Sequence, residues 1–214
     1  ENKDSEPMYY ENLPFRFDTR GIIYNKRGHV YKVNLGTSKF NKIVDGDKNH
    51  IISIGSLVES DKGVVFSYEK YNSKGTMLEE KVGSLETKKI NEVHSKGSMG
   101  NLFYYEGELH AVGLRNRFDW PTNTAVLKLS SNGKVTYRHR TFDRNVVKAE
   151  VNNSVLYFLY EDSGKTLLRD GTNNIDLIDA EVTVKDFAFN NDKTYVIANS
   201  FSKPDEVYEL NNGQ

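Results

Sequence analysis

The feature that most constrains the fold of this chain is a repeat with a period of about 43 residues. Short apolar segments recur after polar turns, beginning at Gly21, Gly63, Gly107, Asn153 and Asp192, with spacings of 42, 44, 46 and 39 residues. Within the segments the apolar residues alternate with polar ones, as in 181–189, which a turn at 190–192 joins to the apolar run 193–198. This period-two pattern indicates strands, and no stretch shows sustained helical spacing. We therefore expect an all-β chain.

A period of this length with four strands per unit is typical of a β-propeller, whose blades hold about 40–50 residues each. The 214 residues accommodate five blades, which we place at 15–44, 50–94, 101–142, 145–179 and 182–214. The last blade has three predicted strands. We expect residues 8–13 to add its fourth strand and close the ring, because closure removes an exposed strand edge. A part of a larger propeller and a β-sandwich or irregular barrel are the alternatives.

The segment 202–213, SKPDEVYELNNG, resembles blades of exported bacterial propellers and of the non-catalytic propeller in prolyl-oligopeptidase-type enzymes. The resemblance implies a repeat fold of the propeller class. It does not carry peptidase activity over, because the sequence lacks the Gly-x-Ser-x-Gly elbow of the hydrolase domain. We expect a single propeller domain at 8–214 behind a polar tether at 1–7.

Composition excludes several classes of protein. Lys+Arg 29 against Asp+Glu 30 gives a net charge of −1, so we expect no nucleic-acid partner. Cysteine is absent, which removes disulfides, thiolate metal sites and a cysteine nucleophile. No apolar run approaches the roughly 18–20 residues of a membrane span. The polar start, ENKDSEP, predicts an exported chain that is secreted or attached to the cell surface, with a lipid anchor upstream of residue 1 as one means of attachment. An arbitrary boundary in a cytosolic protein is the alternative.

We expect no metal ion and no other cofactor. The five histidines show no short metal-ligand spacing. Asp45-Gly46-Asp47 lacks the further ligands of a calcium loop and is interpreted as a turn. The segment 162–166, DSGKT, lacks the first glycine of a phosphate loop, so we interpret it as a Ser-Gly hairpin turn.

Acidic residues on the predicted inner strands suggest an enzyme as the alternative. Five-bladed propellers include glycosidases of the arabinanase and levansucrase groups, which use carboxylates facing the axial funnel. The inner-strand candidates here are Asp18, Glu59, Asp143, Glu150 and Asp186. None lies in a motif of those groups, so we expect no catalysis. A glycoside hydrolase stays the alternative.

The segment most informative about binding is 114–123, which lies between the second and third predicted strands of its blade and is longer than a hairpin needs. In a propeller the loops between second and third strands emerge on the same face as the loops that join one blade to the next. The predicted ligand-binding residues on that face are Trp120, Arg117, Arg115, Phe118, Tyr68, Tyr71 and Phe201. Aromatic and arginine side chains on rigidly held loops are typical of binding sites. We therefore predict a module that binds a protein or a glycan, and a scaffold subunit is a further alternative. In a competing interpretation the aromatic side chains of the loop only fold back against the edge of the blade.

Overall fold

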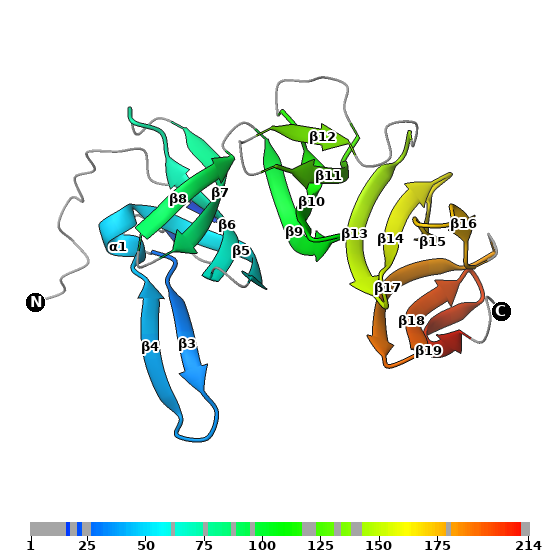
Figure 1. The fold of residues 1–214 in the computed structure, drawn as a ribbon. Coiled ribbons are helices and arrows are strands. Elements are labelled where there is room, and N and C mark those ends of the chain that lie inside the picture. Colours follow the sequence, from blue (N-terminus) through cyan, green and yellow to red (C-terminus); the bar gives the residue numbers. More distant parts are fainter. Residues whose placement is uncertain are drawn as a thin grey trace, which may run out of the picture. The chain divides into compact units, whose positions relative to one another are not determined.

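The computed structural model describes residues 16–17, 21–22, 27–60, 63–74, 77–86, 89–94, 97–116, 123–130, 134–137, 143–178 and 181–210. In these residues the chain is almost entirely strand, with one turn of helix, α1 (Gly46–Asn49) (Figure 1). The all-β prediction is therefore confirmed. The chain forms two compact units, one of residues 1–54 and 68–80 and the other of residues 55–67 and 81–214.

The smaller unit holds two two-stranded antiparallel sheets. Their strands are β1 (Arg16–Phe17) with β2 (Gly21–Ile22), and β3 (Val30–Asn34) with β4 (Lys39–Val44). Helix α1 follows β4, with Asp45 as its N-cap: the Asp45 side chain accepts the Asp47 N–H, which stabilises the first turn. The helix ends at His50, whose backbone is left-handed with φ 55°.

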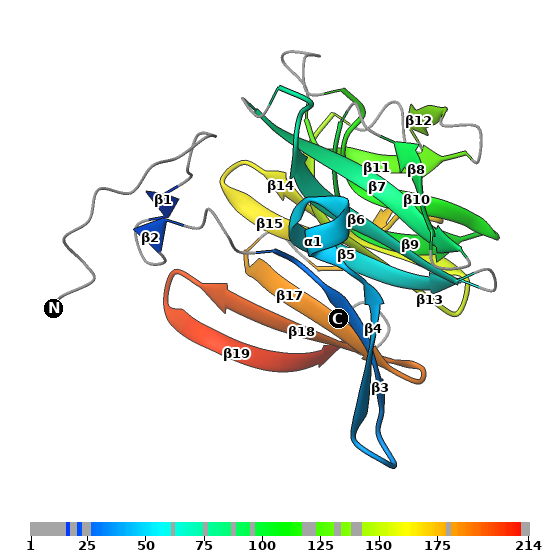
Figure 2. The same cartoon turned by 90° about the vertical axis from the view of Figure 1, so that its left-hand side faces the viewer.

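Three four-stranded antiparallel sheets follow in chain order (Figures 1 and 2). The strands of the first are β5 (Ile51–Ser60), β6 (Gly63–Tyr71), β7 (Leu78–Glu86) and β8 (Lys89–His94). Those of the second are β9 (Ser98–Tyr105), β10 (Glu108–Leu114), β11 (Ala125–Leu129) and β12 (Val135–Tyr137). Those of the third are β13 (Asn145–Asn152), β14 (Val155–Asp162), β15 (Lys165–Asp170) and β16 (Ile175–Asp176). In each sheet, neighbours in sequence are neighbours in space.

A last sheet has three strands, β17 (Thr183–Asn190), β18 (Lys193–Ser200) and β19 (Lys203–Leu210). The predicted units 50–94, 101–142, 145–179 and 182–214 thus coincide with observed sheets, whereas 15–44 forms two separate hairpins. The strand predicted at 8–13 lies outside the described residues. Ring closure, the number of blades and the single-domain assignment stay predictions.

Tight two-residue turns join strands in the larger unit. Both central residues have positive φ at Glu106–Gly107, Asn153–Ser154 and Ser163–Gly164. This backbone matches the twist of antiparallel strands, and Gly, Asn and Ser tolerate it better than β-branched residues do. The Ser-Gly hairpin predicted at 162–166 is therefore confirmed.

Apolar side chains fill the spaces between successive sheets of the larger unit. One cluster packs β9–β12 against the preceding sheet, and its members include Val65, Val82, Leu102, Ala111 and Leu127. A second joins β9–β12 to β13–β16, with Phe103, Val126, Phe158 and Tyr160 among its members. The third joins β13–β16 to β17–β19 through Leu159, Leu168, Val184, Phe187 and Val196. Each sheet is therefore held by its neighbours in the chain.

Candidate functional site

The structure places some of the predicted binding residues. Arg117, Phe118 and Trp120 lie outside the described residues. Arg115 directly follows β10, is exposed, and holds its guanidinium 5.4 Å from the centre of the Tyr137 ring. The long connection predicted at 114–123 has the expected place, because β10 ends at Leu114 and β11 begins at Ala125.

Of the other predicted residues, Phe201 lies in a connection between second and third strands, as predicted, and the two tyrosines lie on β6. Tyr68 was expected in a loop, but it lies inside β6 and is 5% exposed, so packing accounts for this aromatic. Tyr71 is the last residue of β6 and is half-buried. Phe201 stands in the turn between β18 and β19 and is fully exposed. Tyr68 and Tyr71 belong to the smaller unit, whereas Arg115 and Phe201 belong to the larger one.

A polar hollow of about 380 Å³ opens at one end of the larger unit. We call this end the b–c end; it holds the turn 163–164, which joins the second to the third strand of its sheet, and Asn123 and Thr124, which end the corresponding connection of the sheet before it. The hollow is lined by Arg144, Glu161, Asp162, Ser163, Gly164, Lys165 and Thr166. Cationic, anionic and hydroxyl side chains thus surround one concave space.

Hydrogen bonds fix the rim of this hollow. Arg144 donates from Nε to Asp162 Oδ1 at 2.8 Å and from Nη1 to the Asp143 carbonyl at 2.6 Å. The Asn145 side chain donates to Glu161 Oε2 at 3.1 Å and accepts the N–H of Thr124 at 3.2 Å. These bonds join the start of β13 to the end of β14 and to the long connection. Polar contacts at the b–c end therefore link the described ends of neighbouring segments.

The first strand of each later sheet carries a β-bulge. The pairing register shifts at Asn101 in β9, at Val147 in β13 and at Lys185 in β17. A bulge locally turns the strand and re-aims side chains. At or next to the bulges, polar side chains form hydrogen bonds between each sheet and the next one.

Three hydrogen bonds make these connections between sheets. Ser56 Oγ accepts the N–H of Leu102 at 2.7 Å, and Asn101 Oδ1 accepts the N–H of Ala149. Lys148 Nζ donates to the Phe187 carbonyl at 2.9 Å. The partners are 46, 48 and 39 residues apart, close to the period of the repeat. The repeat seen in the sequence is thus also a repeat of polar contacts.

Lys148 is the centre of a charged cluster on β13 and β17. Its Nζ lies 2.6 Å from Asp186 Oδ1, 3.6 Å from Glu150 Oε2 and 4.6 Å from the centre of the Phe187 ring. The two carboxylate oxygens are therefore at most about 6.2 Å apart, an upper limit that leaves room for the roughly 5–5.5 Å of retaining glycosidases and is below the roughly 6.5–9.5 Å of inverting ones. Of the other predicted carboxylates, Asp143 accepts a hydrogen bond from Asn123, Glu59 lies on β5, and Asp18 is outside the described residues.

The lysine keeps Asp186 ionised. Partial burial raises the pKa of Asp186. The hydrogen bonds from Lys148 and the Phe187 N–H, together with the charge of Lys148, lower it by more than burial raises it. The net result is a pKa below the usual aspartate value. A general acid requires a raised pKa, so Asp186 is suited only to the role of base or nucleophile.

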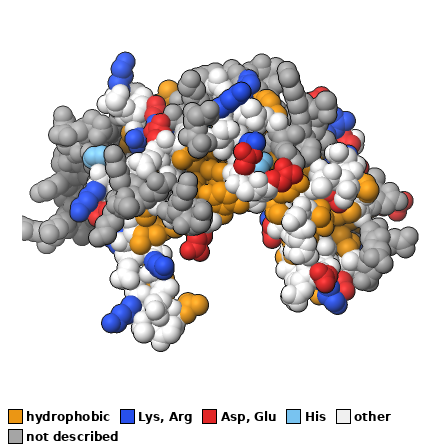
Figure 3. Space-filling model, in the orientation of Figure 1, with side chains coloured by type: hydrophobic (Ala, Val, Ile, Leu, Met, Phe, Trp, Pro, Cys, Tyr) orange, Lys and Arg blue, Asp and Glu red, His pale blue; other side chains and the backbone are white. Residues whose placement is uncertain are grey.

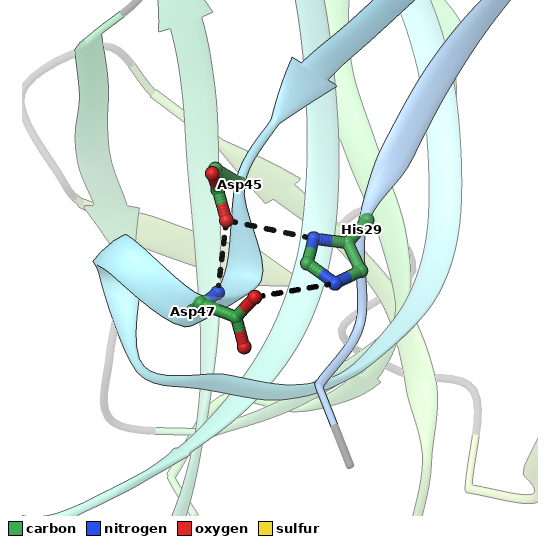
Figure 4. A group of neighbouring side chains, drawn as sticks. All are labelled: His29, Asp45 and Asp47. Atoms are coloured by element: carbon green, nitrogen blue, oxygen red, sulfur yellow. Dashed lines mark hydrogen bonds and ion pairs between the residues drawn. The ribbon is translucent and has the colours of Figure 1, made fainter.

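A cluster of metal-ligand type lies in the smaller unit, where His29, Asp45 and Asp47 come together (Figure 4). His29 Nδ1 is 3.6 Å from Asp45 Oδ1, and His29 Nε2 is 3.8 Å from Asp47 Oδ2. The histidine precedes β3 while both aspartates belong to the start of α1. Gly46 donates its N–H to His29 Nδ1 at 3.1 Å, so in this conformation the proton of a neutral imidazole lies on Nε2.

Charges of both signs are interspersed over the face drawn in Figure 3, with no block of one sign among the described residues. This agrees with the net charge of −1. No helix in the described part of the chain is long and apolar enough to cross a membrane.

Comparisons with known proteins bear on the fold alone. No protein-family model matches the chain, and no curated protein matches it significantly. Two structures of the acylaminoacyl peptidase of Pyrococcus horikoshii are similar, with 13% and 14% sequence identity and a TM-score of 0.73. They cover 98% of this chain and 33% and 34% of the peptidase. The β-propeller domain of the Trilobed protease of Pyrococcus furiosus, described as having an open velcro topology, gives 13% identity and a TM-score of 0.47 over 86% of this chain and 73% of that domain.

The chain thus spans about a third of the length of the archaeal peptidase. At this identity the likeness extends to the fold and not to the activity. Together with the successive four-stranded meanders, it confirms the predicted propeller class.

Sequence reasoning missed two groupings that the structure makes. His29 is 16 residues from Asp45, and no local spacing connects the two. Lys148 is 38 residues from Asp186. The signal for the second grouping was present in the period of the repeat, which places Lys148 and Asp186 at corresponding positions of neighbouring units.

Proposed function

We propose that the chain is a non-catalytic binding module of the propeller class that engages a protein or glycan partner through its b–c end. The observation that carries the proposal is the hollow of about 380 Å³, whose rim is hydrogen-bonded through Asn145 to Thr124 at the end of the long connection. Binding residues are most often held on loops of a rigid scaffold, and here the neighbouring sheets fix those loops by hydrogen bonds.

The lining of the hollow suits a polar partner. Arg144 and Lys165 offer donors, Glu161 and Asp162 offer acceptors, and Ser163 and Thr166 offer hydroxyl groups. Closely spaced donors and acceptors match the hydroxyl groups of a sugar or a polar protein surface. Arg115, stacked on Tyr137 at the start of the connection, extends this surface.

The experiment is binding of the purified chain to an array of neutral and acidic oligosaccharides. Arg144→Met and Trp120→Ala are compared with Lys203→Met, which removes an exposed cation on β19. We expect Arg144→Met and Trp120→Ala each to weaken binding at least tenfold and Lys203→Met to leave it unchanged. Glycan binding that survives both substitutions contradicts the proposed surface. If no glycan binds, the proposal of a glycan partner is wrong. Chemical crosslinks between the native chain and its protein partner must then lie within residues 115–124 or 161–166.

A glycoside hydrolase is the second candidate, favoured by the closeness of Glu150 and Asp186. In that case Asp186 supplies the base or nucleophile and Glu150 is the second carboxylate of the pair. Release of reducing sugar that both Asp186→Asn and Glu150→Gln abolish would establish the hydrolase. Absence of product from substrates that bind would exclude it.

We also propose an extracytoplasmic location, supported by composition alone. Fractionation of the native cells with an antibody against the chain tests it. Recovery in the cytosolic fraction would overturn it.

A further inference from the structure

We propose that His29 and Asp47 bind a divalent transition-metal ion, with Asp45 as the residue that positions the imidazole. This site lies in the smaller unit and is independent of the b–c end. One imidazole nitrogen and carboxylate oxygens are donors that Zn²⁺ accepts readily.

The distance between the two proposed ligand atoms fits one ion. Zn²⁺ lies about 2.0–2.2 Å from histidine nitrogen and carboxylate oxygen and is tetrahedral, so two of its ligand atoms are roughly 3.4 Å apart. His29 Nε2 and Asp47 Oδ2 are 3.8 Å apart. Small side-chain rotations therefore suffice. The Asp47 side chain is 68% exposed, so water has access to the remaining coordination positions.

Metal binding has a defined consequence for the imidazole proton. In the metal-free conformation Nδ1 accepts the Gly46 N–H and the proton lies on Nε2. An ion on Nε2 needs the lone pair of that nitrogen, so the proton leaves Nε2 and Nδ1 becomes the protonated nitrogen. The acceptor for it is Asp45 Oδ1, 3.6 Å away, and the bond from Gly46 is released. A carboxylate that holds the second nitrogen of a metal-bound histidine is a common arrangement.

Of the two carboxylates, Asp47 is the one that faces His29 Nε2. Lys42 Nζ already lies 3.9 Å from Asp45 Oδ2, whereas the Asp47 carboxylate points to His29 (Figure 4). Calcium prefers oxygen ligands only, so the imidazole distinguishes the two kinds of ion.

The test is calorimetric titration of the tag-free chain with ZnCl₂. We expect saturable 1:1 binding that His29→Gln and Asp47→Asn each weaken at least tenfold. Glu181→Gln, at an exposed carboxylate outside the cluster, should leave the affinity unchanged. CaCl₂ should not compete. Circular dichroism verifies that each variant is folded.

A second measurement separates positioning from ligation. Asp45→Ser retains an N-cap residue but loses the reach to His29, and we expect about a tenfold weaker affinity. Asp45→Asn keeps an acceptor oxygen and should restore most of the binding. Hydrogen exchange at the Gly46 amide should accelerate when Zn²⁺ is bound.

Three results would overturn the proposal. The first is the absence of saturable zinc binding, and the second is binding that persists in His29→Gln. The third is unchanged exchange at Gly46 in the zinc-bound chain, which would show that the ion does not use Nε2.

Discussion

Replacing valine by alanine at two corresponding positions tests how the sheets of the larger unit pack. Val126 on β11 pairs with Val112, and Val207 on β19 pairs with Ile197, so both valines occupy third strands at matching places. Val126 is 2% exposed in the cluster between β9–β12 and β13–β16, whereas Val207 is 71% exposed. The chemical change is therefore the same, and only the burial differs.

Val126→Ala removes two buried carbon atoms at about 0.8 kcal/mol each and leaves a cavity, for a total of about 2–3 kcal/mol. Val207→Ala loses strand propensity only, which is worth less than about 1 kcal/mol. For a chain of this size each kcal/mol lowers Tm by about 2–4 °C. Urea unfolding followed by circular dichroism, together with calorimetric Tm, measures both. Equal losses at the two positions would refute the reasoning, because they would show that the outer side of β17–β19 is covered in solution.

Further predictions concern charge, turns and ionisation. Because the pKa of Asp186 is lowered, its pairing with Lys148 stabilises the fold at pH values above the ordinary aspartate pKa, and this stabilisation is lost as pH falls through the lowered value. Lys148→Met should therefore reduce the dependence of the unfolding free energy on pH at acid pH, by less than about 1 kcal/mol at this exposed site. Urea titrations between pH 2 and 7 measure it. Gly164→Ala places a side chain on a backbone with φ +78° and should lower the free energy of unfolding in urea by about 1 kcal/mol. Gly100→Ala, at a residue whose φ is not positive, should lower it by less. The reverse order would contradict the turn assignment. Burial and the hydrogen bond to Asp176 raise the pKa of Tyr160, so its ionisation, followed at 295 nm by the difference from Tyr160→Phe, should lag behind that of free tyrosine; titration at the ordinary pKa would count against this environment.

Local features of the fold were predictable because they depend on neighbouring residues. Ser163–Gly164 and Asn153–Ser154 are residue pairs that suit a tight turn, and their strands pair as the alternation indicates. The bulge at Lys185 is also visible in hindsight, since the buried residues Val184 and Phe187 are three apart instead of two. Four strands per unit followed from the period.

The side-chain clusters that could bind or react were harder to predict from the sequence. Tyr68 was predicted on the loop face that carries the binding residues, yet it lies inside β6 and its ring is buried. The contact of His29 with Asp47 depends on how the turn after β4 places α1. Such positions are set by tertiary packing rather than by the pattern along the chain.

The most direct test of the binding proposal is a titration of the emission of Trp120, the only tryptophan, with oligosaccharides that bind on the array, while the same tubes are assayed for released reducing sugar. The account predicts a saturable shift that Arg144→Met weakens at least tenfold, with no product. A shift accompanied by product, or one that Arg144→Met leaves unchanged, would contradict it.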